Sequence, residues 1–452
     1  MSPQPYCKAA RISPQRIVFF LALYALVLWL LAPLRPLWLD ELLQLSETYA
    51  HTLRQTLVLA AHNGGGVPVA YLAENLIVNH LGQPLVTAHL FSIGCAVAGM
   101  AGLILLAQRL RAGSGWFYSG VLFALLPLSL RYATEARPYG PALAFGTLAT
   151  LLVAFLDKGA ALWKAVLYAA ILSLGIYTQP YVAFVGAAHV AWAISERRRT
   201  SAPYIVGGAA AAAISFLPWY LYARPLWASA VAAGAFRSSL SAKTPLMILH
   251  ELSGGGYILT ILLLTLAAFG YRRTSMPLFC KRLLLFWATV PVPLALAATA
   301  AFGYFFAIRQ LIFVLPPLCI LAAEGLDRLP QRSRWLPVGL GLFAAISLFA
   351  DVRRFTHDRE NWGAAAASAK RLLHPGECLV SIPASASRLY FLYQPSLAGR
   401  LCNADTPSKR VVLISPYATQ KQRHSALHKH HLSITQRFEV GGSIVAVAIP
   451  MR

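Results

Sequence analysis

Ionisable side chains flank the apolar runs of this chain at two places where they could take part in catalysis. Asp40 and Glu41 directly follow the first apolar run, in RPLWLDELL, and the short connection LRYATEARPYGP holds Arg131, Glu135 and Arg137. A positioned carboxylate can act as a general base. The guanidinium fork of arginine suits phosphate. These residue types therefore fit a reaction on a phosphate-bearing substrate.

Each group also has an ordinary structural interpretation. Asp40 could be the N-cap of a helix, with Leu39 and Leu43 forming a hydrophobic staple. Arginines at the end of a membrane helix could simply extend towards the interface. Two arginines with a glutamate between them in one tight connection favour a site over that interpretation.

Three further residues are candidates for substrate contacts. Arg309 lies just inside a late apolar run, in FGYFFAIRQLIFVLPPL, and phosphate is the natural partner of an arginine there. His62 follows the first amphipathic segment, and Tyr139 ends the connection that holds Arg137. A single histidine is more often structural than catalytic, so His62 and Tyr139 are retained as candidate substrate-binding residues only.

The elements that position these residues are predicted to be membrane-spanning helices. The chain is 58% hydrophobic and 12% charged, whereas soluble domains carry about 25% charged residues. The apolar residues form runs long enough to cross a hydrocarbon core of about 30 Å. We expect eleven spans, near residues 17–34, 86–107, 115–131, 140–156, 161–178, 180–195, 203–222, 256–271, 283–301, 307–323 and 335–350.

The distribution of basic residues predicts the orientation of these spans. If the N-terminus is cytoplasmic, 17 Lys and Arg residues before residue 350 lie on the cytoplasmic side and 8 on the outer side. This is the bias of the positive-inside rule. This clustering of basic residues also explains the net charge of +23. Nucleic-acid binding is not needed to account for the charge, and we exclude it. Asp40, Glu135, Arg137 and Arg309 then all belong to the outer face of the plasma (inner) membrane.

The predicted domains are a transmembrane catalytic domain, residues 1–350, and an extracytoplasmic α/β domain, residues 351–452. The first outer loop, residues 35–85, contains two amphipathic segments expected to lie as helices in the interface. The first runs through Leu42, Tyr49 and Leu57, and the second through Val69–Leu81.

The tail changes character, because its apolar runs have the length of strands. These are CLVSIPA, RVVLISP and GGSIVAVAIP, preceded by a helix in ENWGAAAASAKRLL. Cys378 and Cys402 could form a disulfide if the tail is extracytoplasmic, or they could be two free thiols. HSALHKHH could bind a metal, although a solvated basic surface is the better interpretation.

Taken together, the motifs resemble the GT-C glycosyltransferases over about residues 15–330. The shared features are the carboxylate pair after the first span, the R-Y-x-x-E-A-R-P-Y connection and the arginine that opens a Pro-containing late span. Within that superfamily the chain is most similar to the group related to protein O-mannosyltransferases and lipid A aminoarabinose transferases. Two motifs differ from the common pattern, because His62-Asn63-Gly64 replaces H-P-P and Arg309-Gln310 replaces Arg-Tyr.

The resemblance implies an enzyme of the cell envelope, a hexosyl or pentosyl transferase. Its donor would be a polyprenyl-phosphate sugar, its acceptor a hydroxyl of a glycan, lipid or protein, and transfer would invert the anomeric carbon. Matched by position, Asp40, Glu41 and Glu135 are the catalytic carboxylates, and Arg131, Arg137 and Arg309 bind the donor phosphate. Some relatives need a divalent cation such as Mg²⁺ or Mn²⁺, which these carboxylates could bind.

Two other functional classes remain open on sequence alone. A transporter or flippase for a lipid-linked sugar should carry charged residues near the middle of the membrane and an internal repeat, and neither is evident. A non-enzymatic membrane assembly protein would use the tail as a binding module. It would leave the outer carboxylates and arginines as scattered surface charges.

Overall fold

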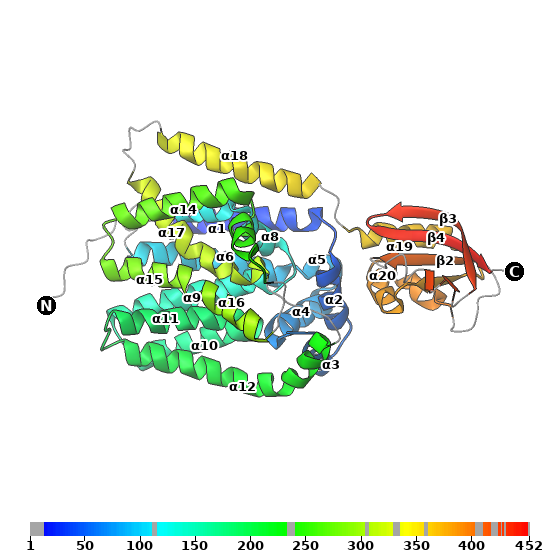
Figure 1. Ribbon diagram of the computed structural model, residues 1–452, viewed down its shortest axis with the longest axis horizontal. Helices are drawn as coiled ribbons and strands as arrows, with labels where there is room; N and C mark the ends of the chain where they lie inside the picture. Colours follow the sequence, from blue (N-terminus) through cyan, green and yellow to red (C-terminus); the bar gives the residue numbers. More distant parts are fainter. Residues whose placement is uncertain are drawn as a thin grey trace. The chain divides into compact units, whose positions relative to one another are not determined.

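The structure is a computed structural model of the full chain (Figure 1). It describes residues 13–110, 115–232, 240–302, 307–328, 335–356, 360–402, 410–416, 424–425, 427–428 and 431–450. The described chain divides into two compact units. The first lies within Met1–Leu31, Thr52–Glu74 and His89–Arg354, and the second within Ala32–His51, Asn75–Ala88 and Phe355–Arg452.

The first unit is an assembly of helices, many of which run alongside one another in Figure 1. Its α-helices are α1 (Pro14–Leu31), α3 (Leu53–His62), α6 (Leu90–Leu110), α7 (Gly115–Leu125), α8 (Pro127–Thr134), α9 (Tyr139–Lys158), α10 (Leu162–Thr178), α11 (Ala183–Ser195), α12 (Ala202–Ala232), α13 (Thr244–Glu251), α14 (Gly256–Arg273), α15 (Leu278–Thr289), α16 (Pro291–Phe302), α17 (Leu315–Asp327) and, as far as Arg354, α18 (Trp335–Thr356). Short 3₁₀ turns, η2 (Pro180–Val182) and η3 (Ile308–Val314), lead into α11 and α17.

The apolar helices make this a multi-pass membrane protein. Among the described residues, six helices are long and apolar enough to cross a bilayer, and α13 with α14, bent by 79°, makes a seventh candidate. Large apolar side chains on α1 face outwards, with Val18 64% and Phe19 71% exposed, as expected of a lipid-facing surface. All eleven predicted runs fall on helical segments, but the number of crossings remains a prediction.

Close helix packing in this unit depends on glycine at one crossing. A Cβ atom added to Gly270 of α14 would lie 1.8 Å from the carbonyl oxygen of Leu321, in α17. Gly325 faces the same crossing, where a Cβ atom would lie 2.5 Å from the carbonyl oxygen of Leu266. Small residues of this kind let two membrane helices approach backbone to backbone.

The second unit combines part of the first loop with the C-terminal segment. It contains η1 (Ala32–Leu34), α2 (Leu39–Thr48), the end of α4 (Pro68–Leu81), α5 (Pro84–Thr87), α19 (Trp362–Leu372) and α20 (Ser387–Tyr393). Its four strands are β1 (Cys378–Ser381), β2 (Val411–Pro416), β3 (Leu432–Val440) and β4 (Ser443–Pro450), in the order β1-β2-β4-β3. β1 pairs parallel with β2, and the other pairs are antiparallel.

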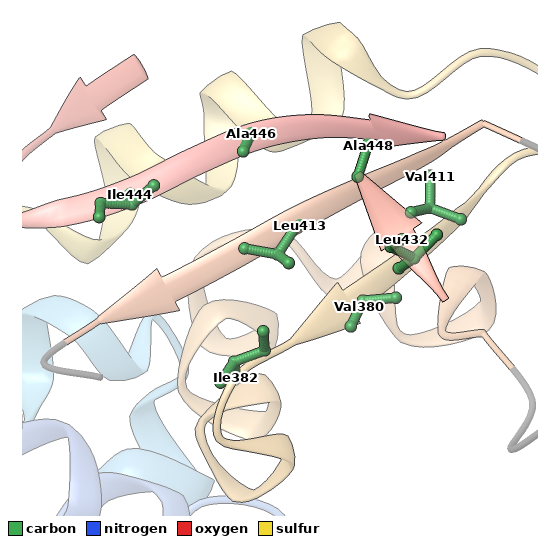
Figure 2. Close-up of a cluster of buried hydrophobic side chains, with 8 residues drawn as sticks. All are labelled: Val380, Ile382, Val411, Leu413, Leu432, Ile444, Ala446 and Ala448. Carbon is green, nitrogen blue, oxygen red and sulfur yellow. The ribbon is translucent and has the colours of Figure 1, made fainter. Parts of the chain in front are cut away.

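Alternate residues of these strands build a core on one face of the sheet. Figure 2 shows Val380, Ile382, Val411, Leu413, Leu432, Ile444, Ala446 and Ala448 gathered there. Cys378 and Cys402 pack against this core and form a disulfide, which resolves the alternative that the sequence left open. The predicted C-terminal α/β fold is thus present as a four-stranded sheet with α19 packed against β2, β4 and β3.

One prediction of local structure is wrong, and one strand was not predicted. The first amphipathic segment of the loop is two helices, α2 and α3, separated at Ala50, whose φ is 60°. Thr52 then caps α3 by accepting from the N–H of Gln55. Strand β3 was not expected, because its apolar residues alternate with polar ones in LSITQRFEV and form no continuous apolar run like those of the other strands.

Candidate active site

The connection between α8 and α9 is a tight turn fixed by backbone contacts. Glu135 ends α8, and the N–H of Arg137 donates to the Glu135 carbonyl at 2.8 Å. The hydroxyl of Ser92 in α6 donates to the Arg137 carbonyl at 3.0 Å. A Cβ atom on Gly140 would lie 2.7 Å from the Tyr132 carbonyl oxygen, so only glycine lets α9 begin this close to α8.

Glu135 is the buried carboxylate of this site, with 2% of its surface exposed. Its Oε1 lies 3.1 Å from Nε of Arg131, one turn earlier on α8. The same oxygen lies 3.8 Å from Nη2 of Arg354, in the last turn of α18. Two guanidinium groups therefore share one carboxylate, which compensates the cost of burying its charge.

Two tyrosines connect this ion pair to Arg309. The rings of Tyr132 and Tyr139 meet edge to face with centroids 5.0 Å apart. Nε of Arg309, in η3, donates to the Tyr139 hydroxyl at 2.8 Å. The guanidinium carbons of Arg309 and Arg137 lie 5.5 and 6.0 Å from the Tyr139 ring centroid, within the range of a cation–π contact.

We call this group the arginine cluster, meaning Arg131, Arg137, Arg309 and Arg354 with Glu135, Tyr132 and Tyr139. Arg131 and Arg354 pair with the buried carboxylate of Glu135, and Arg309 and Arg137 lie beside the Tyr139 ring. Glu135 and Tyr139 orient Arg131, Arg354 and Arg309 before any ligand is present. Such a preorganised, half-buried set of cations is suited to binding an anion, and to stabilising negative charge that grows during a reaction.

A second backbone contact holds the other end of α8. The N–H of Leu128 donates to the Ser253 carbonyl at 3.0 Å. Gly254 has a φ of 78°, and a Cβ atom there would lie 2.4 Å from the Leu128 nitrogen. The bend between α13 and α14 therefore packs directly against the start of α8 and fixes the helix that carries Arg131.

Asp40 and Glu41 lie in the first turn of α2, in the second unit. The N-cap of α2 is Trp38, and its N–H donates to Glu41 Oε2 at 3.1 Å. Glu41 is 1% exposed, whereas Asp40 is half-buried. The alternative that Asp40 is the helix N-cap is therefore wrong, since Asp40 is the second residue of the helix and Glu41 caps its first turn.

The remaining predicted residues divide into two groups. Tyr139 belongs to the arginine cluster and is 5% exposed. His62 is exposed at the end of α3, where its Nδ1 lies 2.8 Å from the Val58 carbonyl oxygen of its own helix. Within the described ranges, no three His, Cys, Asp or Glu side chains gather as they would around a metal ion. His430 of the predicted histidine group lies outside the described residues.

The structure adds Arg354 and Tyr132 to the residues found from sequence. Arg354 belongs to the basic end of the last apolar helix, and its pairing with Glu135 has no signal in the local sequence. Tyr132 is part of the R-Y-x-x-E motif, and its place in that motif could have identified it as a site residue.

Comparison with known proteins identifies the fold. No protein-family profile matches the sequence, and no curated protein sequence does. Among solved structures, ArnT from Cupriavidus metallidurans in the apo state is similar over 96% of this chain and 98% of its own, with a TM-score of 0.63 and 14% identity. ArnT bound to undecaprenyl phosphate has the same TM-score and coverage with 13% identity.

A more distant solved structure has the same architecture. The archaeal oligosaccharyltransferase AglB from Archaeoglobus fulgidus, in complex with an inhibitory peptide and a dolichol-phosphate, has a TM-score of 0.53 and 11% identity. The similarity covers 88% of this chain and 69% of AglB. At these identities the matches establish the fold, and they do so over nearly the whole chain. The protein has the fold of the GT-C glycosyltransferases, mostly helical and membrane-spanning with a small C-terminal sheet.

Proposed function

We propose that the protein is an inverting glycosyltransferase that moves a sugar from a polyprenyl-phosphate donor to an acceptor hydroxyl. The observation that carries the proposal is the arginine cluster, a set of preorganised cations within a GT-C fold. The similar ArnT structure with bound undecaprenyl phosphate supports a donor of this class. The dolichol-phosphate in the AglB structure supports it as well.

The arginines suit the leaving group of this reaction. When the bond between the anomeric carbon and the phosphate oxygen breaks, the phosphate gains negative charge. Arg309, Arg137 and Arg131 would stabilise that charge, with Arg354 as a further cation beside Glu135. Hydrogen-bond donors that are already fixed around a developing anion make one of the largest contributions to catalysis. They need no reorganisation here, because Tyr139 and Glu135 already orient Arg309 and Arg131.

Asp40 is proposed as the general base. It would accept the proton of the acceptor hydroxyl while that oxygen forms the new bond to the anomeric carbon. The phosphate leaves from the opposite face of the sugar with the electron pair of the broken bond, so the configuration inverts. Glu41 is held by the Trp38 N–H and shapes the field near Asp40. Glu135 orients Arg131 and Arg354.

The membrane arrangement proposed here has eleven crossings, a cytoplasmic N-terminus and an outer C-terminal domain in the plasma membrane. The 17-to-8 bias of basic residues supports this orientation. The Cys378–Cys402 disulfide also supports it, because disulfides persist in oxidising compartments.

The experiment that tests the function is mass spectrometry of envelope glycolipids, polysaccharides and glycoproteins. Cells with the gene, without it, and without it but complemented by Asp40→Asn are compared. One defined sugar should disappear on deletion, return with the wild-type gene and stay absent with Asp40→Asn. An unchanged glycan profile after deletion, with accumulation of no lipid-linked sugar, contradicts the proposal.

A further inference from the structure

Helix α2, which carries Asp40, is held at its first turn by a residue of the C-terminal segment. The N–H of Leu39, the first residue of α2, donates to Glu360 Oε2 at 3.1 Å. The first N–H groups of a helix have no partner within the helix. A carboxylate is a favourable partner because it also meets the positive end of the helix dipole. Glu360 therefore fixes the backbone next to Asp40.

Glu360 is itself held in place by its neighbours. The indole N–H of Trp362 donates to the same oxygen, Oε2, at 3.1 Å. Trp362 is 1% exposed and packs against Tyr390, with ring centroids 4.9 Å apart. The carboxylate that meets α2 is thus part of the packed start of α19.

The turn between β3 and β4 supports this arrangement. Asn361 is the N-cap of α19, and its side chain accepts from the N–H of Ala364 at 2.9 Å. Its own N–H donates to the Gly441 carbonyl at 2.8 Å. Gly441 has a φ of 54°, and a Cβ atom there would lie 2.6 Å from Asn361. The hairpin of the sheet therefore fixes the residue that follows Glu360.

The opposite end of α2 is held in the same unit. Glu47 Oε1 lies 3.7 Å from Nη2 of Arg388, in α20. The Asn75 side chain donates to the carbonyls of Thr48 and His51 at 2.7 and 2.8 Å. Contacts at both ends restrict how α2 can shift or tilt.

We propose that the C-terminal four-stranded domain clamps helix α2, and that Glu360 is a positioning residue for Asp40. The proposal rests on the proposed function, because it assumes that Asp40 is the base. It gives the C-terminal domain a role in positioning a catalytic group, rather than that of a separate binding module. Glu360 acts through the backbone of α2 and does not itself touch the substrate.

The first test compares Glu360→Ala with Glu360→Gln in the purified full-length protein, with a polyprenyl-phosphate sugar as donor. A single oxygen accepts both hydrogen bonds, so glutamine can retain both and alanine loses both. Glu360→Ala should lower kcat by about 10- to 100-fold, since a shift of about 1 Å in a catalytic group can cost that much. The KM for the donor should stay within about threefold, because Glu360 has no part in phosphate binding.

Glu360→Gln should recover most of kcat, to within about fivefold of the parent, because only the charge assistance is lost. Glu439→Gln is the matched control, an acid-to-amide change at an exposed side chain of β3 in the same unit. It should leave kcat unchanged. A glutamine variant as slow as the alanine variant, or an alanine variant as fast as the parent, overturns the proposal.

A second test removes the hydrogen-bond donor, the Leu39 N–H, instead of the Glu360 carboxylate that accepts from it. It therefore applies even if Glu360→Ala does not fold. Leu39→Pro deletes one N–H at the first helical position, where proline is well tolerated. Trp38 before it is already extended, at φ −91° and ψ 175°, as a residue before proline prefers. Leu39→Ala is the control, because it removes the side chain and retains the N–H.

Leu39→Pro should reduce kcat as Glu360→Ala does, and Leu39→Ala should not. Combining Leu39→Pro with Glu360→Ala should add little, since both remove the same hydrogen bond. Additive losses overturn the proposal. If the wild-type protein transfers no sugar, the proposed function fails, and if Asp40→Asn remains active, the assignment of Asp40 as the base fails. If Asp40 is essential but the Glu360 and Leu39 variants are as fast as the parent, only the clamp fails.

Discussion

Replacing Tyr139 by phenylalanine tests how much the Tyr139 hydroxyl contributes to holding Arg309 in position before the donor binds. The change removes the hydroxyl that accepts from Arg309 Nε at 2.8 Å. It leaves the ring that meets Tyr132 and lies beside Arg309 and Arg137. We therefore expect Arg309 to remain in the site but to lose its fixed orientation.

The size of the effect follows from what is lost. Ordering one long side chain on binding costs about 0.5–1.5 kcal/mol. This corresponds to about 2- to 12-fold weaker binding of a polyprenyl-phosphate donor. Arg309→Ala removes the charge as well. Because Arg309 is half-buried, we take the lower part of the range for a charged partner, about 2–3 kcal/mol. That is about 30- to 140-fold.

The assay is equilibrium binding of polyprenyl phosphate to the purified protein, with thermal melting to confirm folding. Tyr177→Phe is the matched control, because its hydroxyl bonds to the Ser215 carbonyl outside the cluster. It should not change the affinity. In an Arg309→Ala background, Tyr139→Phe should have almost no further effect, since Tyr139 acts through Arg309. Equal losses from Tyr139→Phe in both backgrounds would refute this reasoning.

Three further outcomes are expected. Arg309→Lys should bind polyprenyl phosphate with an affinity between those of the parent and Arg309→Ala, because lysine keeps the charge and loses the guanidinium fork. An affinity equal to that of the parent would contradict forked binding of the phosphate by Arg309. Replacing Cys378 and Cys402 by serine opens a loop of sequence separation 24, so the C-terminal domain should lose about 3 kcal/mol of stability. Limited proteolysis would detect this, and an unchanged cleavage rate contradicts it. A reporter fused after Arg452 should be active only outside the cytoplasm, and activity confined to the cytoplasm reverses the proposed orientation.

The sequence predicted the parts of this fold that depend on local composition. Apolar runs of span length identified the helices, because a bilayer selects long apolar segments wherever they occur. The strands β1, β2 and β4 were found from short β-branched runs. β3 was missed because its apolar residues alternate with polar ones in LSITQRFEV and so form no continuous apolar run. The break at Ala50 was also missed, because no glycine or proline marks it.

The candidate site shows the same division between local and distant contacts. Arg131, Glu135, Arg137 and Tyr139 were found together because one short motif contains them all. Arg354 pairs with Glu135 from the far end of α18, and Glu360 meets Leu39 from the C-terminal segment. Tertiary packing alone creates such pairs, so they have no local signal. Asp40 was considered as an N-cap because aspartate favours that position, but Glu41 caps the turn from its third residue instead.

Sugar transfer by the purified protein tests the central claim most directly. The protein is reconstituted in vesicles with a polyprenyl phosphate carrying a labelled sugar and with an extract of envelope acceptors. Wild-type protein should release free polyprenyl phosphate and move the label to an acceptor with inverted configuration. Asp40→Asn should still bind the lipid but transfer about 10²- to 10⁴-fold more slowly, the contribution of a general base. Transfer by Asp40→Asn at more than about a tenth of the parent rate would contradict the assignment of the base. Failure of the wild-type protein to transfer any lipid-linked sugar would contradict the function itself.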